Sequence, residues 1–222
     1  MNFSDILASS IHDIKNSLSM IINAAEMLAD DDAIKATHAD KASALEHEAR
    51  RVNNCMIQLL SLYKFDSGRQ SIRIDECNLD DCLQELVAEN AHSAQSNGVH
   101  IECECDEFLN GYFDLDLVRG VLNSSIGNAE RYANSRVRLS GSIEEGYTVF
   151  RIEDDGDGFS EDMIEINDTL NDGDSFASAR TNLGLFFAKR VAESHEAGER
   201  RGYIRLRNQV GMSGGCFEMW LP

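Results

Sequence analysis

The chain has 222 residues, 42% of them hydrophobic, and its 39 acidic and 20 basic side chains give a formal net charge of -19. This length is enough for one substantial domain and a smaller one. The acidity excludes nucleic acid and anionic membranes as main partners, because both would be repelled at long range. No apolar run is long enough to span a bilayer and the N-terminus lacks a signal-peptide pattern, so we expect a cytoplasmic protein. Its six cysteines contain no C-x-x-C pair and are expected to be reduced, buried thiols.

Two helices with regular apolar spacing are predicted at the N-terminus. The first covers residues 7–28, where apolar side chains recur in steps of four and three, and the second covers residues 42–63. Joined by a short turn, they make an antiparallel hairpin. Since a lone hairpin leaves apolar flanks exposed, we expect two copies to form a dimeric four-helix bundle. A linker is predicted at residues 65–71, with the domain boundary between residues 66 and 67.

Strands and helices alternate in the rest of the chain, residues 67–222. Strands are predicted at 71–74, 99–105, 148–154, 202–208 and 216–222, and helices at 79–95, 115–133 and 183–195. This mixture indicates a two-layer α/β domain.

A histidine lies at the edge of the apolar stripe of the first predicted helix. His12 is followed by Asp13, and Asn16 lies one turn later on the same face. Such a histidine can attack phosphorus, with Asp13 orienting the ring and accepting its proton. A solvated surface pair is the other interpretation, and these residues alone leave both open.

The segment EDDGDGF, residues 153–159, follows a predicted strand. Asp154, at the end of that strand, could accept a hydrogen bond from an exocyclic amine such as that of adenine. Gly156 and Gly158 would let the backbone pass close to a bound ligand. A plain acidic turn is the alternative.

A calcium loop is a third interpretation of the same segment. Glu153, Asp155 and Asp157 have the spacing of EF-hand ligands. However, Ile164 stands where the bidentate acid should be, and a strand precedes the loop where an EF-hand has a helix. A calcium-binding or adaptor module would also leave His12 without a role.

Two later segments carry residues that suit a phosphorylated ligand. On the helix predicted at 115–133, Asn128 offers a neutral oxygen for magnesium and Arg131 could meet phosphate oxygens. Gly184 lies at the start of the helix predicted at 183–195, where free backbone amides favour an anion. Ordinary surface positions are the alternative for each of them taken singly.

In this order, the segments resemble the sensor histidine kinases of two-component signalling, over nearly the whole chain. HDIKN at 12–16 looks like the phosphoacceptor box, residues 114–133 like the asparagine box, DDGDG at 154–158 like the D-x-G-x-G adenine box, and residues 182–195 like the second glycine box with its helix. GGCFEMWLP is similar to the closing strand. The resemblance implies a dimerisation and phosphoacceptor hairpin at residues 1–66. It also implies, at residues 67–222, a two-layer α/β sandwich of the histidine-kinase/Hsp90-type ATPase fold.

The resemblance also implies an ATP-dependent protein-histidine kinase that uses Mg²⁺. His12 would take the phosphoryl group from ATP, with Asp13 as its base, and pass it to an aspartate in the receiver domain of a response regulator. Asn16 would position water for dephosphorylation of that regulator. The nucleotide-binding residues would be Asn128 (also at the metal), Arg131, Tyr132, Asp154, Gly156, Gly158 and Gly184.

The chain departs from the family pattern in three places. Ser124 replaces the first asparagine of the asparagine box, with Asn123 beside it on a different helix face, and Ser17 replaces a proline. Arg180 and Asn182 replace two glycines of the second glycine box. These changes leave a second function open: a phosphotransfer relay protein whose kinase-like domain no longer binds ATP.

Overall fold

The computed structural model describes residues 14, 20–22, 24, 45, 48, 49, 52–65, 67, 68, 71–165 and 183–222. By its internal packing the chain divides into two compact units, Met1–Gln70 and Ser71–Pro222. The assignment of a phosphoacceptor hairpin to residues 1–66 and of a catalytic domain to residues 67–222 stays a prediction.

The first unit is helical at each position that the structure describes before residue 66. Residues 52–65 form a continuous helix that overlaps the second predicted helix. Ile22 of the first predicted helix and Ala49 of the second are buried in one cluster. The antiparallel hairpin and its dimerisation into a four-helix bundle stay predictions.

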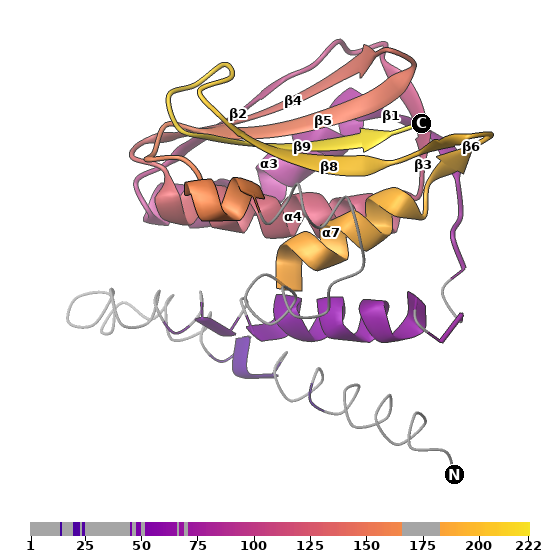
Figure 1. The fold of residues 1–222 in the computed structure, drawn as a ribbon. Helices are drawn as coiled ribbons and strands as arrows, with labels where there is room; N and C mark the ends of the chain where they lie inside the picture. The colour runs from indigo at the N-terminus through magenta and orange to yellow at the C-terminus, as the bar shows by residue number, and fades with distance from the viewer. Residues whose placement is uncertain are drawn as a thin grey trace. The chain divides into compact units, whose positions relative to one another are not determined.

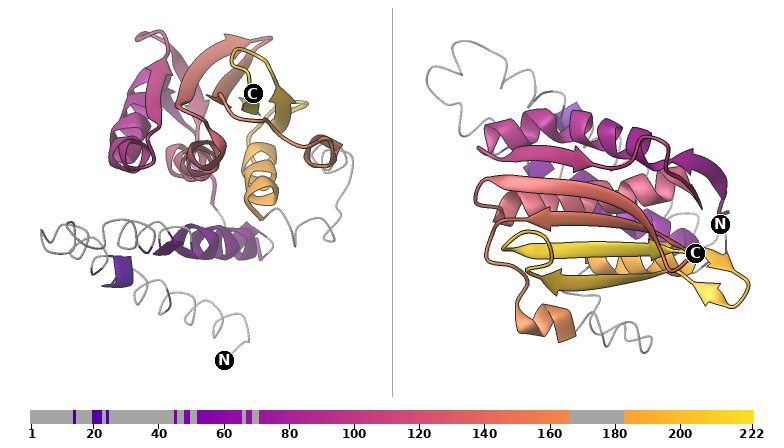
Figure 2. Two further views of the ribbon diagram at one scale, coloured as in Figure 1. Left: turned by 90° about the vertical axis from the view of Figure 1, so that its left-hand side faces the viewer. Right: turned by 90° about the horizontal axis from the view of Figure 1, so that it is seen from above.

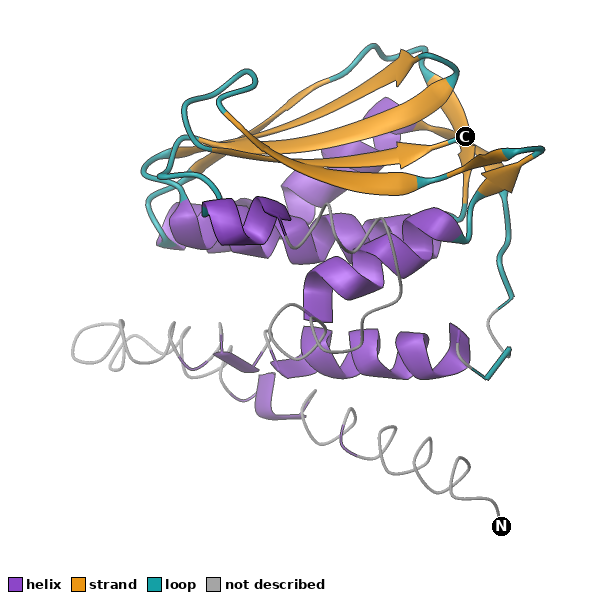
Figure 3. Ribbon diagram, viewed as in Figure 1, coloured by secondary structure: helices purple, strands orange, loops and turns teal. Residues whose placement is uncertain are grey.

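The second unit mixes strands and helices (Figure 3). In chain order its elements are β1 (Asp75–Asn78), α3 (Leu79–Ser96), β2 (His100–Glu104), β3 (Asn110–Phe113), α4 (Leu115–Tyr132), β4 (Arg136–Glu144), β5 (Tyr147–Asp154), α7 (Leu183–Glu193), β6 (Glu196–Ala197), β7 (Arg200–Arg201), β8 (Tyr203–Asn208) and β9 (Gly215–Leu221).

Five strands of this unit form one sheet, in the order β2-β4-β5-β9-β8. β2 runs parallel to β4, and the other neighbours are antiparallel. Helices α3, α4 and α7 lie side by side against one face of the sheet, as the end-on view shows most clearly (Figures 1 and 2). The predicted two-layer α/β sandwich is therefore confirmed for this unit.

Helix α4 packs against the sheet through apolar side chains that recur at helical spacing. Its buried positions include Leu117, Val118, Val121, Leu122 and Ile126, which places one face of the helix against the sheet and leaves the other to solvent. At its start, the carboxylate of Asp114 accepts a hydrogen bond from the backbone N–H of Leu117 at 3.1 Å, as an N-cap does.

The turn between β4 and β5 is set by two residues with positive φ. Glu145 has φ 53° and Gly146 has φ 79°, the pair of conformations that a tight antiparallel connection needs. The register that follows places Arg138 opposite Glu153 and Val137 opposite Asp154. The turn thus fixes the position of Asp154 at the end of β5.

The strand predicted at residues 71–74 is wrong. These residues have no regular structure, and β1 begins at Asp75. The alternating apolar side chains suggested a strand, but the partner, β3, pairs with the four residues that follow. Strands β3 and β4, and the short β6–β7 ladder, were not predicted, whereas the three predicted helices and the other four strands are confirmed within a few residues.

Among the helices that the structure describes, none combines the length and apolarity of a membrane span. All six cysteines are unpaired, as expected, but only Cys82 and Cys216 are buried and the others are half-buried. The expectation that all six are buried is wrong.

Candidate functional site

The exposed end of α4 carries the residues predicted to meet phosphate and magnesium. Asn128 and Arg131 are exposed because the apolar face of the same helix is turned to the sheet. Tyr132, the last residue of α4, has a side chain that is 66% exposed. The helix therefore presents an amide, a guanidinium and a phenol to solvent within its last two turns.

The turn that follows β5 is pinned to this end of α4. A Cβ atom added at Gly156 would lie 2.0 Å from the backbone oxygen of Tyr132, so only glycine allows the two backbones to approach this closely. Gly158 has φ +82°, which also favours glycine. The fold itself therefore favours glycine at both positions, in addition to the predicted close approach of the backbone to a ligand.

Asp155 joins the turn to the connection between α4 and β4. Its carboxylate accepts hydrogen bonds from the backbone N–H groups of Asn134, Ser135 and Arg136 and from the Ser135 hydroxyl. Burial alone would raise the pKa of Asp155, but these hydrogen bonds, that of the Ser135 hydroxyl first, outweigh it and lower the pKa from its ordinary value. The carboxylate is therefore a structural anchor.

Asp154 is buried at the C-terminal end of the central strand β5, and only one of its two carboxylate oxygens accepts hydrogen bonds within the described part of the chain. Oδ1 accepts hydrogen bonds from the backbone N–H of Gly156 at 2.8 Å and of Gly215 at 3.2 Å. In the part of the chain that the structure describes, Oδ2 accepts no hydrogen bond. The carboxylate is thus held in a fixed orientation with one free acceptor, which suits an exocyclic amine of a base.

These residues fit a magnesium nucleotide in the chemistry of their donors. Oδ2 of Asp154 can accept from the base, Arg131 can meet phosphate oxygens, and the amide oxygen of Asn128 is a neutral ligand for magnesium. In the described residues there is no group of three His, Cys, Asp or Glu side chains that could hold a metal ion alone. Magnesium bound here would therefore rely on phosphate and water oxygens beside Asn128.

The calcium interpretation of the same turn is wrong, because two of the three proposed carboxylate ligands are hydrogen-bonded within the protein. Glu153 is buried, and its carboxylate accepts hydrogen bonds from Arg138 and from the backbone N–H of Gly211. Asp155 is engaged by the residues after α4. Both carboxylates belong to the framework of the fold, so they cannot converge on a cation with Asp157.

Residues 113–222 match the family model of histidine kinase-, DNA gyrase B- and HSP90-like ATPases. The chain is 24% identical over 196 residues to the sensor histidine kinase GraS of Staphylococcus epidermidis, covering 86% of this chain and 54% of GraS. It is 25% identical over 226 residues to the sensor histidine kinase ZraS of Salmonella typhimurium, covering 98% of this chain and 45% of ZraS. The chain thus spans about half the length of these relatives.

Residues 113–222 thus form an ATPase domain of the histidine kinase-, DNA gyrase B- and HSP90-like kind, and the curated relatives with which the chain aligns are sensor histidine kinases. Solved structures agree on its fold. The catalytic domain of the histidine kinase ThkA, in a nucleotide-free form, has a TM-score of 0.55 at 18% identity, covering 68% of this chain and 96% of that one. Full-length ShkA in complex with AMPPNP has a TM-score of 0.62 at 18% identity, covering 97% of this chain and 44% of that one.

Within the ATPase domain, Asn123 does not substitute for the family asparagine that is replaced by Ser124. Its amide oxygen accepts a hydrogen bond from Asn90 at 2.8 Å, and its amide nitrogen donates to Glu89 at 3.2 Å. Both partners lie on α3, so Asn123 faces away from the exposed side of α4. The predicted difference between the two helix faces is confirmed.

The remaining predicted residues of the ATPase domain fall partly outside the described chain. Gly184 is the second residue of α7, in agreement with a glycine at a helix start. Arg180 and Asn182 lie outside the described residues. So do His12, Asp13 and Asn16 of the predicted phosphoacceptor segment.

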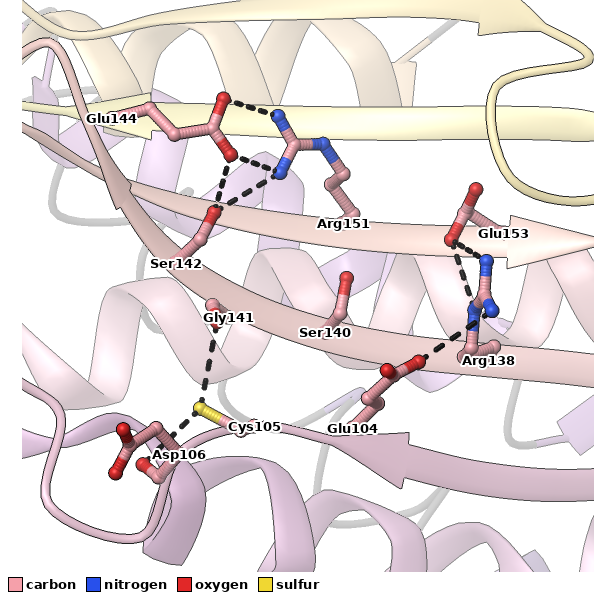
Figure 4. A pocket seen from close by; sticks show the side chains of 10 residues that line it. All are labelled: Glu104, Cys105, Asp106, Arg138, Ser140, Gly141, Ser142, Glu144, Arg151 and Glu153. Carbon is pink, nitrogen blue, oxygen red and sulfur yellow. Dashed lines mark hydrogen bonds and ion pairs between the residues drawn. The ribbon is translucent and has the colours of Figure 1, made fainter.

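A hollow of about 530 Å³ lies on the face of the sheet opposite the helices (Figure 4), whereas Asn128 and Arg131 lie on helix α4. It holds two arginines, but Arg138 pairs with Glu153 at 2.8 Å and Arg151 pairs with Glu144 at 2.6 Å. Because each guanidinium is already neutralised by a carboxylate, the hollow offers no free cation to phosphate. We therefore do not assign the nucleotide to it.

Sequence reasoning missed several residues that position Asp154. Gly215 donates to its carboxylate, and the N–H of Gly214 donates to its backbone oxygen at 3.0 Å. A Cβ atom at Gly214 would lie 2.3 Å from Oδ1 of Asp154. The adjacent glycines at the start of the last predicted strand were the available signal, since two neighbouring glycines there indicate a close approach of backbone.

Proposed function

We propose that the chain is an ATP-dependent histidine kinase that phosphorylates His12. The observation that carries this proposal is the fixed carboxylate of Asp154, whose free Oδ2 lies at the edge of an ATPase domain where α4 ends. An acceptor of this kind is suited to the amine of adenine. Arg131 and Asn128 would then hold the phosphates and the magnesium ion.

His12 is the proposed acceptor of the phosphoryl group. A ring nitrogen of His12 attacks the γ-phosphorus, the bond to the bridging oxygen breaks, and ADP leaves with that electron pair. Asp13 takes up the proton from the other ring nitrogen. Magnesium supplies charge neutralisation at the phosphates.

The partner of the phosphorylated protein is proposed to be a response regulator receiver domain, whose aspartate takes the phosphoryl group. Asn16, one helical turn after His12, would position water for the reverse function, dephosphorylation of that regulator. Dimerisation of the predicted hairpin into a four-helix bundle, and a cytoplasmic location, belong to the same proposal.

Incubation of the purified chain with γ-labelled ATP and magnesium tests the kinase. We expect acid-labile label on the wild type and none on His12→Ala or Asp154→Asn. Asp157→Asn is the matched control, because Asp157 is an exposed carboxylate of the same turn and should leave the label unchanged. Label that persists on His12→Ala would place the phosphoryl group elsewhere.

A phosphotransfer relay is the second candidate function. Asn123 is hydrogen-bonded to residues of α3, so it does not supply the asparagine that Ser124 replaces. Arg180 and Asn182, which stand where the family has glycines, favour the same function. A relay would take no label from ATP but would accept it at His12 from a phosphorylated receiver domain. The same proteins, incubated with that donor, separate the two functions.

A further inference from the structure

The segment that leaves the DDGDG turn is held by one asparagine from a distant strand. Asn208, the last residue of β8, accepts a hydrogen bond from the backbone N–H of Phe159 at 2.8 Å. Its amide nitrogen donates to the backbone oxygen of the same residue, also at 2.8 Å. One carboxamide therefore satisfies both backbone groups of Phe159, as a neighbouring strand would.

Two glycines make room for this contact. A Cβ atom at Gly158 would lie 2.7 Å from Oδ1 of Asn208, and Gly158 has φ +82°. A Cβ atom at Gly215 would lie 3.0 Å from the ring of Phe159. Side chains at either position would displace Asn208 or Phe159, so the glycines and the asparagine act together.

The contacts close a ring around the turn. Asp154 accepts from Gly215 of β9 at 3.2 Å, Gly215 is paired with Asn208 of β8, and Asn208 holds Phe159. Phe159 in turn follows Asp154 by five residues. Both ends of the turn are thus attached to the same β8–β9 ladder, and the carboxylate of Asp154 is part of the ring.

We propose that Asn208 is a positioning residue of the nucleotide site: it holds Phe159 so that the turn keeps Asp154 oriented with Oδ2 toward the ligand. This inference rests on the proposed function. Asn208 acts through the backbone of the turn, and no contact of its own with the nucleotide is required.

Asn208→Ala removes both hydrogen bonds. Asn208→Asp keeps the acceptor for the Phe159 N–H but sets a carboxylate against its carbonyl oxygen. Since Asn208 is exposed, neither change buries an unpaired group, and both variants should fold. Asn97→Ala is the matched control, because Asn97 is an exposed asparagine at the end of α3, remote in sequence from the turn.

Two measurements on the full chain test the proposal. In the ligand-free protein, amide hydrogen exchange at Phe159 should be about tenfold faster in Asn208→Ala than in the wild type or Asn97→Ala, as expected for the loss of two hydrogen bonds. The affinity for a non-hydrolysable ATP analogue with magnesium should fall by about tenfold in both Asn208 variants.

The outcomes separate this inference from the proposed function. Unchanged exchange at Phe159 would show that Asn208 does not hold the turn. Faster exchange with unchanged affinity would overturn the positioning role while leaving the kinase proposal intact. A wild type that binds no nucleotide would overturn the proposed function and the positioning role together, while the exchange data would still show whether the clamp exists.

Discussion

The ring of His195 and the backbone N–H of Asp114 form a buried hydrogen bond across 81 residues of sequence, with Nε2 3.0 Å from the amide nitrogen. The other ring nitrogen, Nδ1, lies 2.7 Å from the backbone oxygen of Val191. A neutral ring that donates from Nδ1 and accepts at Nε2 satisfies both contacts. Since Asp114 caps α4, His195 connects the end of α7 to the start of the helix that carries Asn128 and Arg131.

This bond predicts that the domain loses stability in mild acid. Burial lowers the pKa of His195 below its ordinary value of 6.5. Between the two pKa values the unfolded chain binds more protons than the native one, so stability rises with pH in that window and is lost below it. In urea unfolding, the free energy of unfolding should therefore fall more, or rise less, from pH 7.5 to pH 5.5 in the wild type than in His195→Gln.

The variant His195→Gln should cost about 3 kcal/mol at pH 7.5, because a buried partner and packed atoms are lost. The cost should shrink as the pH falls, since Gln does not titrate. His92→Gln, an exposed position on α3, should change neither value. A cost for His195→Gln that is independent of pH would show that protonation of this ring plays no part.

Glu130 should change the free energy of unfolding with pH in the opposite direction to His195. One carboxylate oxygen accepts a hydrogen bond from Ser93 at 2.9 Å, and the other is buried and has no hydrogen-bond partner among the residues that the structure describes. Burial raises the pKa of Glu130 above its ordinary value of 4.5. Above pH 4.5 the native chain holds a proton that the unfolded chain has released, so stability falls as the pH rises toward the native pKa.

Glu130→Gln should therefore stabilise the domain at pH 8 by roughly 1 kcal/mol, with a gain that decreases toward pH 5. Chemical unfolding at both pH values measures this difference. Glu107→Gln, at an exposed position, is the matched control and should be neutral. Destabilisation by Glu130→Gln at pH 8 would mean that the charged carboxylate has a favourable partner.

Two aspartates of one turn should differ sharply in their effect on stability. Asp155→Ala removes the acceptor for three backbone N–H groups and a hydroxyl, and should lower the free energy of unfolding by about 3 kcal/mol. Asp157→Ala should change it by less than about 0.5 kcal/mol, because this side chain is exposed. Equal effects in thermal unfolding would contradict the anchoring role of Asp155.

Two glycines offer a similar contrast. Gly214→Ala places a methyl group 2.3 Å from the Asp154 carboxylate, so it should destabilise the domain and weaken nucleotide binding more than tenfold, as overpacking beside a fixed group does. Among the described residues, outside the neighbouring backbone of its own helix, no atom lies within 4 Å of a Cβ position at Gly127 of α4, and Gly127→Ala should stabilise the helix by about 0.5–1 kcal/mol. Calorimetry and nucleotide titration of both variants check the pair.

The sequence was most informative where the spacing of side chains carries the structure. The helical spacing from Leu117 to Ile126 predicted α4, and the apolar run before Asp154 predicted that this residue ends a strand, as it does in β5. Strand β3 could not be predicted in the same way, because Asn110–Phe113 is short and its pairing with β1 depends on tertiary contacts. Residues far apart in sequence, such as His195 with Asp114 or Asn208 with Phe159, gave no local signal.

Most missed roles belong to residues whose partners are backbone groups. Asp155 looked like a ligand because acidic side chains at this spacing are typical of calcium loops. In the structure its acceptors are used by the N–H groups of residues 134–136. Composition cannot distinguish a carboxylate that binds a cation from one that binds backbone, because both need the same oxygen atoms.

The position of β9 in the sheet has a consequence for biosynthesis. Gly215–Leu221 lies between β5 and β8 and is buried along its whole length, although it is made after all the strands that surround it. A nascent chain on the ribosome can form its earlier hairpins and helices, but the sheet stays divided until this segment has emerged. Stalled or prematurely released polypeptides would expose the unpaired edges of β5 and β8, which makes them candidates for chaperone capture or degradation.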